Sequence, residues 1–269
     1  MKGTKMKFDL VSDLHIDMWD KQFHFDWLNE QKSDTLVIAG DISDHIDMSC
    51  EYVVKMQEYY KTVMVIDGNH EHQPRFPSVE ESTNDYKVAI RQTGAHYLGD
   101  RHFQQDDIRF IGVNGWWSFD FGDPNVPFDT CVNAFLAKTS WGRPAVKEQF
   151  RQGVKDCQFL LNQMLDAQED DTVSKIVVVT HPLPHPSCIS WNVYPDDNNF
   201  TGLYGNSKFQ WTLDADRKGK LKYWLFGHNH DHKDIPYKGA RLISNPRGRP
   251  KDWNREVYSP RQLEVGHDF

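Results

Sequence analysis

The 269-residue sequence predicts an α/β fold built in layers, and three observations predict it. Short apolar runs rich in β-branched residues alternate with helix-like patterns along the chain. The length suits one compact domain with large loops, residues 1–269. The composition, 38% hydrophobic and 26% charged, is that of a chain with a sizeable apolar core, which excludes disordered and fibrous classes.

Six apolar runs predict largely buried strands, because each is short and bounded by turn-forming residues. They cover residues 6–12, 35–39, 62–67, 109–114, 175–180 and 221–226. Helical periodicity between them predicts helices over residues 23–32, 49–60, 80–93 and 144–168. On the last helix the expected apolar face carries Phe150, Val154, Cys157, Leu161 and Leu165.

Residues 95–117 depart from this alternation. Two short runs are joined by residues 104–107, which predicts a hairpin and the start of a second sheet. Residues 116–141 and 185–211 are rich in aromatic, Asn, Pro and Gly residues and are expected to be long loop insertions. Their aromatic residues suit either binding or the sealing of sheet edges. A C-terminal tail is expected from about residue 250.

Charge and cysteine content restrict the partners and the compartment. The 31 Lys and Arg against 39 Asp and Glu give a net charge of −8, which disfavours long nucleic acid but allows small anionic substrates. The four cysteines lack the density of a disulfide scaffold, so we expect reduced thiols. With neither a signal peptide nor a membrane span in evidence, we expect a cytoplasmic protein that does not bind membranes; its oligomeric state stays open.

Residue types that bind metals or move protons follow nearly every predicted strand. They are Asp13 and His15, Asp41 and Asp44, Asn69 and His70, then His181, and finally His228 and His230. Ligands gather at the carboxyl ends of strands in α/β sheets, and residues two apart in an extended segment point the same way. Gly40, Gly68 and Gly227 precede three of these groups, where bulkier residues would obstruct a crowded site. Each residue alone also fits a solvated histidine or a turn, but coincidence does not explain the whole set.

These blocks resemble the calcineurin-like metallophosphoesterase family. The matching stretches, in order, are Asp13-Leu14-His15, Gly40-Asp41-Ile42-Ser43-Asp44, Gly68-Asn69-His70-Glu71, His181 and Gly227-His228-Asn229-His230. The resemblance spans residues 6 to about 248 and five ordered blocks, which is far more specific than one short motif. It implies a four-layer αββα sandwich of two mixed β-sheets flanked by helices.

The resemblance also implies a pair of divalent transition-metal ions. Asp13, His15, Asp41 and His230 would hold one ion, and Asp41, Asn69, His181 and His228 the other, with Asp41 bridging both. Imidazole and carboxylate ligands without thiolate suit Mn, Fe, Zn, Co or Ni, of which we expect Mn.

In this family a metal-bridging hydroxide attacks the phosphorus in line. His70 would protonate the leaving oxygen or stabilise its charge, and Asp44 would orient the imidazole. Asn69 and His70 would also contact the substrate. The alternatives are a packed structural histidine and a simple helix cap. Arg247 and Arg249 could clamp a phosphate, but we expect an Arg-rich tail to be a solvated surface.

The sequence thus predicts a hydrolase of ester bonds that acts on a small phosphodiester or a nucleotide-like compound, whose base could stack on Trp116, Trp117 or Trp191. A phosphomonoesterase is the main alternative. A nuclease would need a basic groove, and a non-catalytic metal-bound scaffold would not need His70 and Asp44. The sequence argues against a serine/threonine phosphatase, because His45 and Ile46 follow Asp44 where that class has Arg-Gly.

Overall fold

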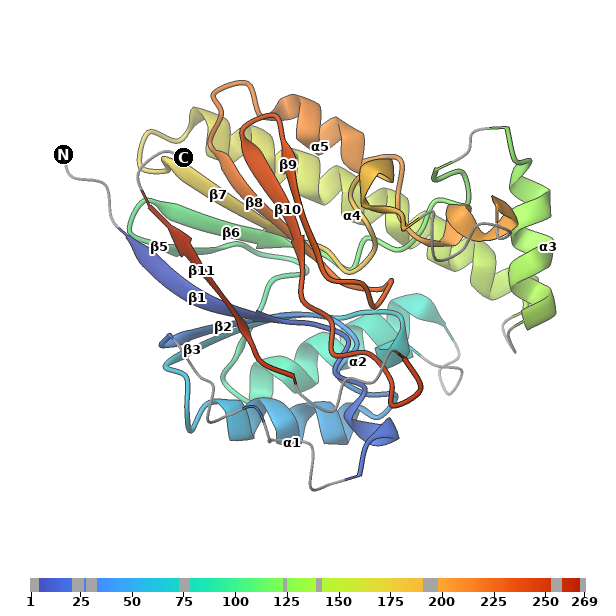
Figure 1. Cartoon of the computed structure of the whole chain (residues 1–269), viewed down its shortest axis with the longest axis horizontal. Helices are drawn as coiled ribbons and strands as arrows, with labels where there is room; N and C mark the ends of the chain where they lie inside the picture. The colour runs from blue at the N-terminus through green and yellow to red at the C-terminus, as the bar shows by residue number, and fades with distance from the viewer. Residues whose placement is uncertain are drawn as a thin grey trace.

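The computed structural model describes residues 5–20, 27, 33–72, 78–122, 125–138, 142–190, 198–252 and 258–266. Two mixed β-sheets lie face to face, with helices on both outer sides (Figure 1). Apolar side chains of both sheets, among them Phe8, Met64, Phe110 and Leu225, pack in the layer between them. The predicted four-layer α/β sandwich is therefore confirmed.

The first sheet has the order β11-β1-β2-β3-β4. Its strands are β1 (Met6–Val11), β2 (Thr35–Ala39), β3 (Thr62–Ile66), β4 (His96–Tyr97) and β11 (Arg261–Val265). β1 to β4 run parallel, and β11 pairs antiparallel with β1, so that Met6 lies opposite Val265. The segment that the sequence predicts as a tail therefore supplies an edge strand.

The second sheet has the order β5-β6-β7-β8-β10-β9. Its strands are β5 (Phe103–Gln105), β6 (Ile108–Gly112), β7 (Lys175–Val179), β8 (Leu221–Phe226), β9 (Lys233–Tyr237) and β10 (Ala240–Ser244). The four central strands are parallel, and the antiparallel strands β5 and β9 form the edges. The β5–β6 hairpin turns at Asp106, whose φ is 53°, and it starts this sheet as predicted. The predicted connection, residues 104–107, is too long, because Gln104 and Gln105 pair with β6 as part of β5.

Two helices cover each sheet from outside (Figure 1). They are α1 (Ile46–Met56) and α2 (Val79–Gln92) on the first sheet, and α4 (Arg143–Glu169) and α5 (Phe209–Ala215) on the second. Three of the four predicted helices therefore lie where the periodicity placed them, to within a few residues. The fourth, residues 23–32, falls outside the described residues except for Trp27, whose side chain is buried.

The buried face of α4 differs from the prediction. Cys157, Leu160 and Met164 are fully buried against the second sheet, whereas Leu165 is 41% exposed. Residues three, four and seven apart share a face of a helix, so the observed core face is rotated by about one position from the predicted one.

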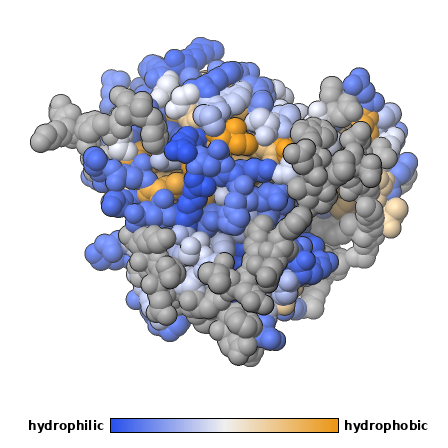
Figure 2. Space-filling model, in the orientation of Figure 1, coloured by the Kyte–Doolittle hydropathy of each residue, from blue (hydrophilic) through white to orange (hydrophobic). Residues whose placement is uncertain are grey.

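The two predicted loops contain helical structure. α3 (Phe128–Lys138) lies in residues 116–141, and short 3-10 segments at Pro186–Cys188 and Asn198–Leu203 lie in residues 185–211. No helix in the described part of the chain is long and apolar enough to span a membrane. On the face drawn in Figure 2, the described residues are mostly hydrophilic, with small apolar patches between them.

Candidate metal centre

Both sheets contribute to one site at their carboxyl edge. The segments after β1, β2 and β3 meet those after β7 and β8 there. The backbone N–H of His228 donates to Asp13 Oδ1 over 2.8 Å, which joins the two sheets directly at the site. The contacts described below bring all seven predicted metal ligands into this one region.

Four of the predicted ligands form a tight cluster of acceptor atoms. One ligand atom from each of Asp13, His15, Asp41 and His230 lies within 4.8 Å of the other three. The Nε2 atoms of His15 and His230 are 3.0 Å apart, and His230 Nε2 is 3.5 Å from Asp13 Oδ1. This is the set that the family resemblance predicts for the first ion.

The second set shares Asp41 with the first. His181 Nε2 lies 3.2 Å from both Asp41 Oδ2 and Asn69 Oδ1, and His228 Nδ1 lies 2.9 Å from Asn69 Oδ1. Asp41 Oδ2 is also 3.8 Å from His15 Nε2. One buried carboxylate therefore borders both groups of ligands, as expected of a bridging residue.

Three of the four histidines have their second ring nitrogen engaged away from the cluster. His181 Nδ1 meets the Ala39 carbonyl at 2.9 Å, His228 Nε2 the Leu203 carbonyl at 2.8 Å, and His230 Nδ1 Asp252 Oδ2 at 2.5 Å. A carbonyl or carboxylate can only accept, so each outer nitrogen carries the hydrogen. When such a ring is neutral, its inner nitrogen has a lone pair for a metal.

Burial and charge set the protonation of this cluster. Burial lowers the pKa of His15 well below its usual value and that of His228 to about 3, so both rings are neutral. Burial also acts on His181, but Asp41 outweighs it and raises the pKa of His181 to about 10. The pKa of Asp41 is lowered, because His181 and His70 outweigh its burial. Asp41 thus holds a proton on His181 that a bound metal would displace, and a set of imidazoles and buried carboxylates then fits divalent transition metals.

The backbone is strained where it carries these candidate ligands. Asp13, His15, Asp41, His228 and His230 all have φ between 44° and 74°, a left-handed conformation that non-glycine residues seldom adopt. The predicted close approaches at glycine are also present. A Cβ at Gly68 would lie 2.2 Å from Asp41 Oδ1, and one at Gly227 would lie 2.4 Å from Asp13 Oδ2.

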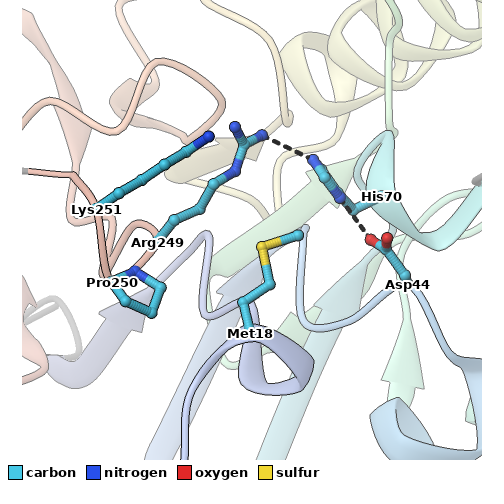
Figure 3. Close-up of a pocket in the computed structure, with 6 residues that line it drawn as sticks. All are labelled: Met18, Asp44, His70, Arg249, Pro250 and Lys251. Carbon is cyan, nitrogen blue, oxygen red and sulfur yellow. Dashed lines mark hydrogen bonds and ion pairs between the residues drawn. The ribbon is translucent and has the colours of Figure 1, made fainter.

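His70 lies beside the cluster in the predicted arrangement with Asp44. Its Nδ1 is 2.5 Å from Asp44 Oδ1 (Figure 3). Its backbone N–H donates to Asp41 Oδ1 over 2.9 Å. Burial lowers the pKa of His70, but Asp41 and Asp44 together outweigh burial and raise it. The geometry suits a positioned proton donor whose other nitrogen, Nε2, is directed toward a pocket.

Glu71 has a structural part in the site that the sequence did not assign. Its buried carboxylate accepts the backbone N–H of Ile42 at 2.6 Å, of Gly68 at 2.6 Å and of Asp41 at 3.1 Å. Burial, followed by the charge of Asp41, raises the pKa of Glu71 to about 7. Glu71 thereby ties the segments after β2 and β3 together. The sequence feature that could have identified Glu71 is its position as the fourth residue of the block Gly68-Asn69-His70-Glu71.

The segment after β10 corrects the expectation of a solvated Arg-rich tail. Arg247 is fully buried with its guanidinium 4.4 Å from the centre of the Trp19 ring. Arg249 Nη2 lies 3.0 Å from His70 Nε2. Asp252, which holds His230, comes from the same segment. No local sequence pattern identified Asp252, because only the tertiary fold brings it to His230.

The expected stacking of a base on the aromatic loops is wrong for two of the three tryptophans. Trp116 is fully buried, and Trp117 is 5% exposed and stacks on His228 with ring centres 5.5 Å apart. These two rings belong to a core cluster with Phe119 and Phe135, so they pack in the interior next to the site. Trp191 lies outside the described residues.

The comparisons with known proteins agree with this geometry. The family model described as calcineurin-like phosphoesterase matches residues 6–232. No curated protein sequence matches the chain.

Among solved structures, the chain is similar to phosphopantetheinyl hydrolase from Mycobacterium tuberculosis. The TM-score is 0.71 and the identity 15%, with 96% of this chain and 95% of that chain covered. A putative 5'-nucleotidase from Staphylococcus aureus has a TM-score of 0.54 at 15% identity, covering 98% of this chain and 51% of that chain. TT1561 of Thermus thermophilus has a TM-score of 0.54 at 9% identity, covering 98% and 99%. At these identities the likeness shows the fold alone. The family model, in contrast, matches most of the sequence, and this match shows that the chain belongs to the calcineurin-like phosphoesterase family.

Proposed function

We propose that the chain is a binuclear metal-dependent phosphoesterase that hydrolyses small phosphodiesters or nucleotide-like esters. The observation that carries the proposal is the position of Asp41 between two groups of ligand atoms. Its Oδ2 lies 3.8 Å from His15 Nε2 on one side and 3.2 Å from His181 Nε2 on the other. A carboxylate has two oxygens and can serve two cations about 3.5–4 Å apart.

When bound, two divalent ions, for which we propose Mn, would supply Lewis-acid stabilisation of phosphate charge and lower the pKa of water. The residues of the chain supply the rest. His70, oriented by Asp44, donates a proton to the leaving oxygen through Nε2. Asn69 and His70 lie next to each other at the rim and hold the phosphate in place for in-line attack.

The net charge of the chain and the volume of the pocket beside His70 both support a small substrate. The net charge of −8 repels long polyanions, which argues against a nuclease. The pocket beside His70 has a volume of about 510 Å³, the size of a small-molecule site. Two of the similar structures are named as a phosphopantetheinyl hydrolase and a putative 5'-nucleotidase, names that favour small phosphate esters. The location that we propose is the cytoplasm.

Phosphomonoester hydrolysis is the second candidate, favoured by the nucleotidase among the similar structures. A non-catalytic scaffold is disfavoured, because a scaffold has no use for the His70–Asp44 pair that faces the pocket.

The test is a substrate screen of protein reconstituted with Mn, Fe, Zn, Co or Ni. Aryl phosphodiesters, aryl phosphomonoesters and cyclic nucleotides are compared, with metal-stripped protein as the control. We expect diester hydrolysis that requires metal. Hydrolysis of monoesters alone would favour the second candidate, and equal rates after complete metal removal would overturn the binuclear mechanism.

A further inference from the structure

A pocket opens beside His70, against the segment that follows β10 (Figure 3). Its lining consists of Met18, Asp44, His70, Arg249, Pro250 and Lys251 (Figure 3). Within the described part of the chain, none of the seven predicted metal ligands lines it. A molecule held in this pocket would therefore extend beyond the phosphate that is being hydrolysed.

The segment that carries the two basic residues is fixed to the metal site at several points. The backbone N–H groups of Arg247 and Gly248 donate to the carbonyls of Ser12 and Asp13, each over 2.9 Å. Asp252 Oδ2 accepts the backbone N–H of Arg249 at 2.9 Å and also meets His230 Nδ1. The position of Arg249 is thus set relative to Asp13 and His230.

The basic side chains in this pocket form no ion pair with a carboxylate of the described residues, although the charge of Arg249 acts on the nearby Asp252. Arg249 Nη2 meets only the ring nitrogen of His70, and Arg249 Nε is buried with no hydrogen-bond partner within the described ranges. Neither Arg249 nor Lys251 forms an ion pair with any described residue. The two nearby carboxylates pair with histidines instead: Asp44 with His70, and Asp252 with His230. A guanidinium pairs far better with an anion than with an imidazole nitrogen.

We propose that Arg249 and Lys251 bind a second anionic group, carried by the leaving alcohol of the substrate. This inference rests on the function proposed above and narrows its substrate class. The preferred substrates are phosphate esters whose leaving group carries a further phosphate or carboxylate. The leaving side is indicated because His70 Nε2, which would face the leaving oxygen, lies directly against Arg249. Binding of the anion draws the guanidinium away from Nε2 and frees that nitrogen for proton transfer.

Three aryl phosphodiesters with the same nitrophenol chemistry test the proposal. The first is methyl 4-nitrophenyl phosphate, the second carries a carboxylate on the nitrophenyl ring, and the third carries it on the ester group that is retained. We expect wild-type kcat/KM to be about tenfold or more higher for the second than for the first, the effect of one charge-assisted contact of about 1.4 kcal/mol or more. The third should show no such preference.

Variants assign the preference to residues. Arg249→Met and Lys251→Met should bring the ratio between the second and first substrates close to one. Arg217→Met and Lys61→Met are matched controls, since both residues are exposed and lie before the amino ends of β8 and β3, and they should keep the wild-type ratio. Metal content and melting temperature verify that each variant is folded; Lys251 is exposed, so its variant should fold in any case.

A binding measurement separates this proposal from the hydrolytic function. Calorimetry compares phenylphosphonate with 4-carboxyphenylphosphonate, which cannot be hydrolysed. Tighter binding of the carboxylated phosphonate, lost in both Met variants, would support the anion site. This result does not depend on turnover. If no ester were hydrolysed, the proposed function would be wrong, but the anion site would stand. Equal binding of the two phosphonates, or a rate preference that follows the carboxylate on the retained group, would overturn the inference.

Discussion

Two histidines on one 3-10 turn, His70–His72, both pair with a carboxylate but differ in their second ring nitrogen. His70 Nδ1 lies 2.5 Å from Asp44, and its Nε2 is directed toward the pocket and Arg249. His72 Nε2 lies 2.6 Å from Asp67, and its Nδ1 is 2.6 Å from Ser82 Oγ. Both nitrogens of His72 are thus engaged inside the protein. A histidine–carboxylate pair can therefore act on a substrate only when the second ring nitrogen of the histidine is accessible.

The environments explain the difference. The Asp67–His72 pair is enclosed between α2 and the strands, where Tyr97 and Asn114 also donate to Asp67. Asn114 also donates a hydrogen bond to the carbonyl of Gly68. This network therefore holds the turn that precedes Asn69. The Asp44–His70 pair sits at the rim, where the side chain of Asp44 is 30% exposed. One pair shapes the site, and the other can act in it.

The largest expected effect is that of Asp41→Asn, which removes the carboxylate that contacts His70 and both ligand groups. The loss of turnover should exceed the about 10²–10⁴-fold cost of a lost general acid, and the bound metal should fall as well. Steady-state rates and elemental analysis measure both. Asn69→Ala is the matched comparison, and an effect of Asn69→Ala larger than that of Asp41→Asn would speak against a bridging role.

His70→Asn should abolish the function of the accessible pair while sparing the fold. We expect about 10²–10⁴-fold slower hydrolysis of alkyl esters, normal metal content and a normal melting temperature. The loss should be smaller on nitrophenyl esters, because a leaving group of low pKa departs without protonation. Equal losses on both kinds of ester would remove the proton-donor role from His70.

His72→Leu should have the opposite profile. It leaves Asp67 buried without its histidine, and breaking a buried pair costs about 3–5 kcal/mol of unfolding free energy. Urea unfolding measures this cost, with the conservative His72→Gln as a milder control. Metal-loaded His72→Leu protein that remains folded should keep far more turnover than His70→Asn. A comparable loss of turnover would erase the distinction between the two histidines.

Asp44→Asn should weaken His70 without removing it. An outer partner that orients a catalytic or ligating histidine is typically worth about 10–100-fold, so the loss should be smaller than that of His70→Asn. The dependence on leaving group should have the same direction. A double variant no slower than His70→Asn alone would confirm that Asp44 acts through His70, whereas additive losses would contradict that interpretation.

The smallest effect concerns acid stability. Burial raises the pKa of Asp67, but His72, Tyr97 and Asn114 outweigh burial, and the net pKa is lowered. A carboxylate with a depressed folded pKa stabilises the fold above its unfolded pKa, and this stability is lost as the pH falls through the folded pKa. His72→Leu should therefore move the acid-unfolding midpoint, followed by circular dichroism, to a higher pH. An unchanged midpoint would show that Tyr97 and Asn114 alone hold Asp67 ionised.

The sequence by itself determined the layered α/β class and where the candidate ligands gather. This worked because the relevant signals are local. A β-branched run marks a buried strand, and the residues directly after it lie at the carboxyl edge whatever the order of strands in the sheet. Asp13, Asp41 and His228 could thus be placed together before any tertiary contact was known. Their roles in binding metal stay predictions.

Only the tertiary structure decided which residues more distant in the chain join the site. Arg249 meets His70 across 179 positions, and β11 pairs with β1 across the whole chain. Periodicity did not predict which face of α4 is buried. Leu160, which is buried, and Leu165, which is exposed, each lie on an apolar stripe of the helix. Composition likewise suggested a solvated tail for residues that burial and backbone hydrogen bonds fix against Asp13. The physical reason is that such contacts depend on the complementarity of surfaces that meet only after the sheets have packed, and no local pattern records them.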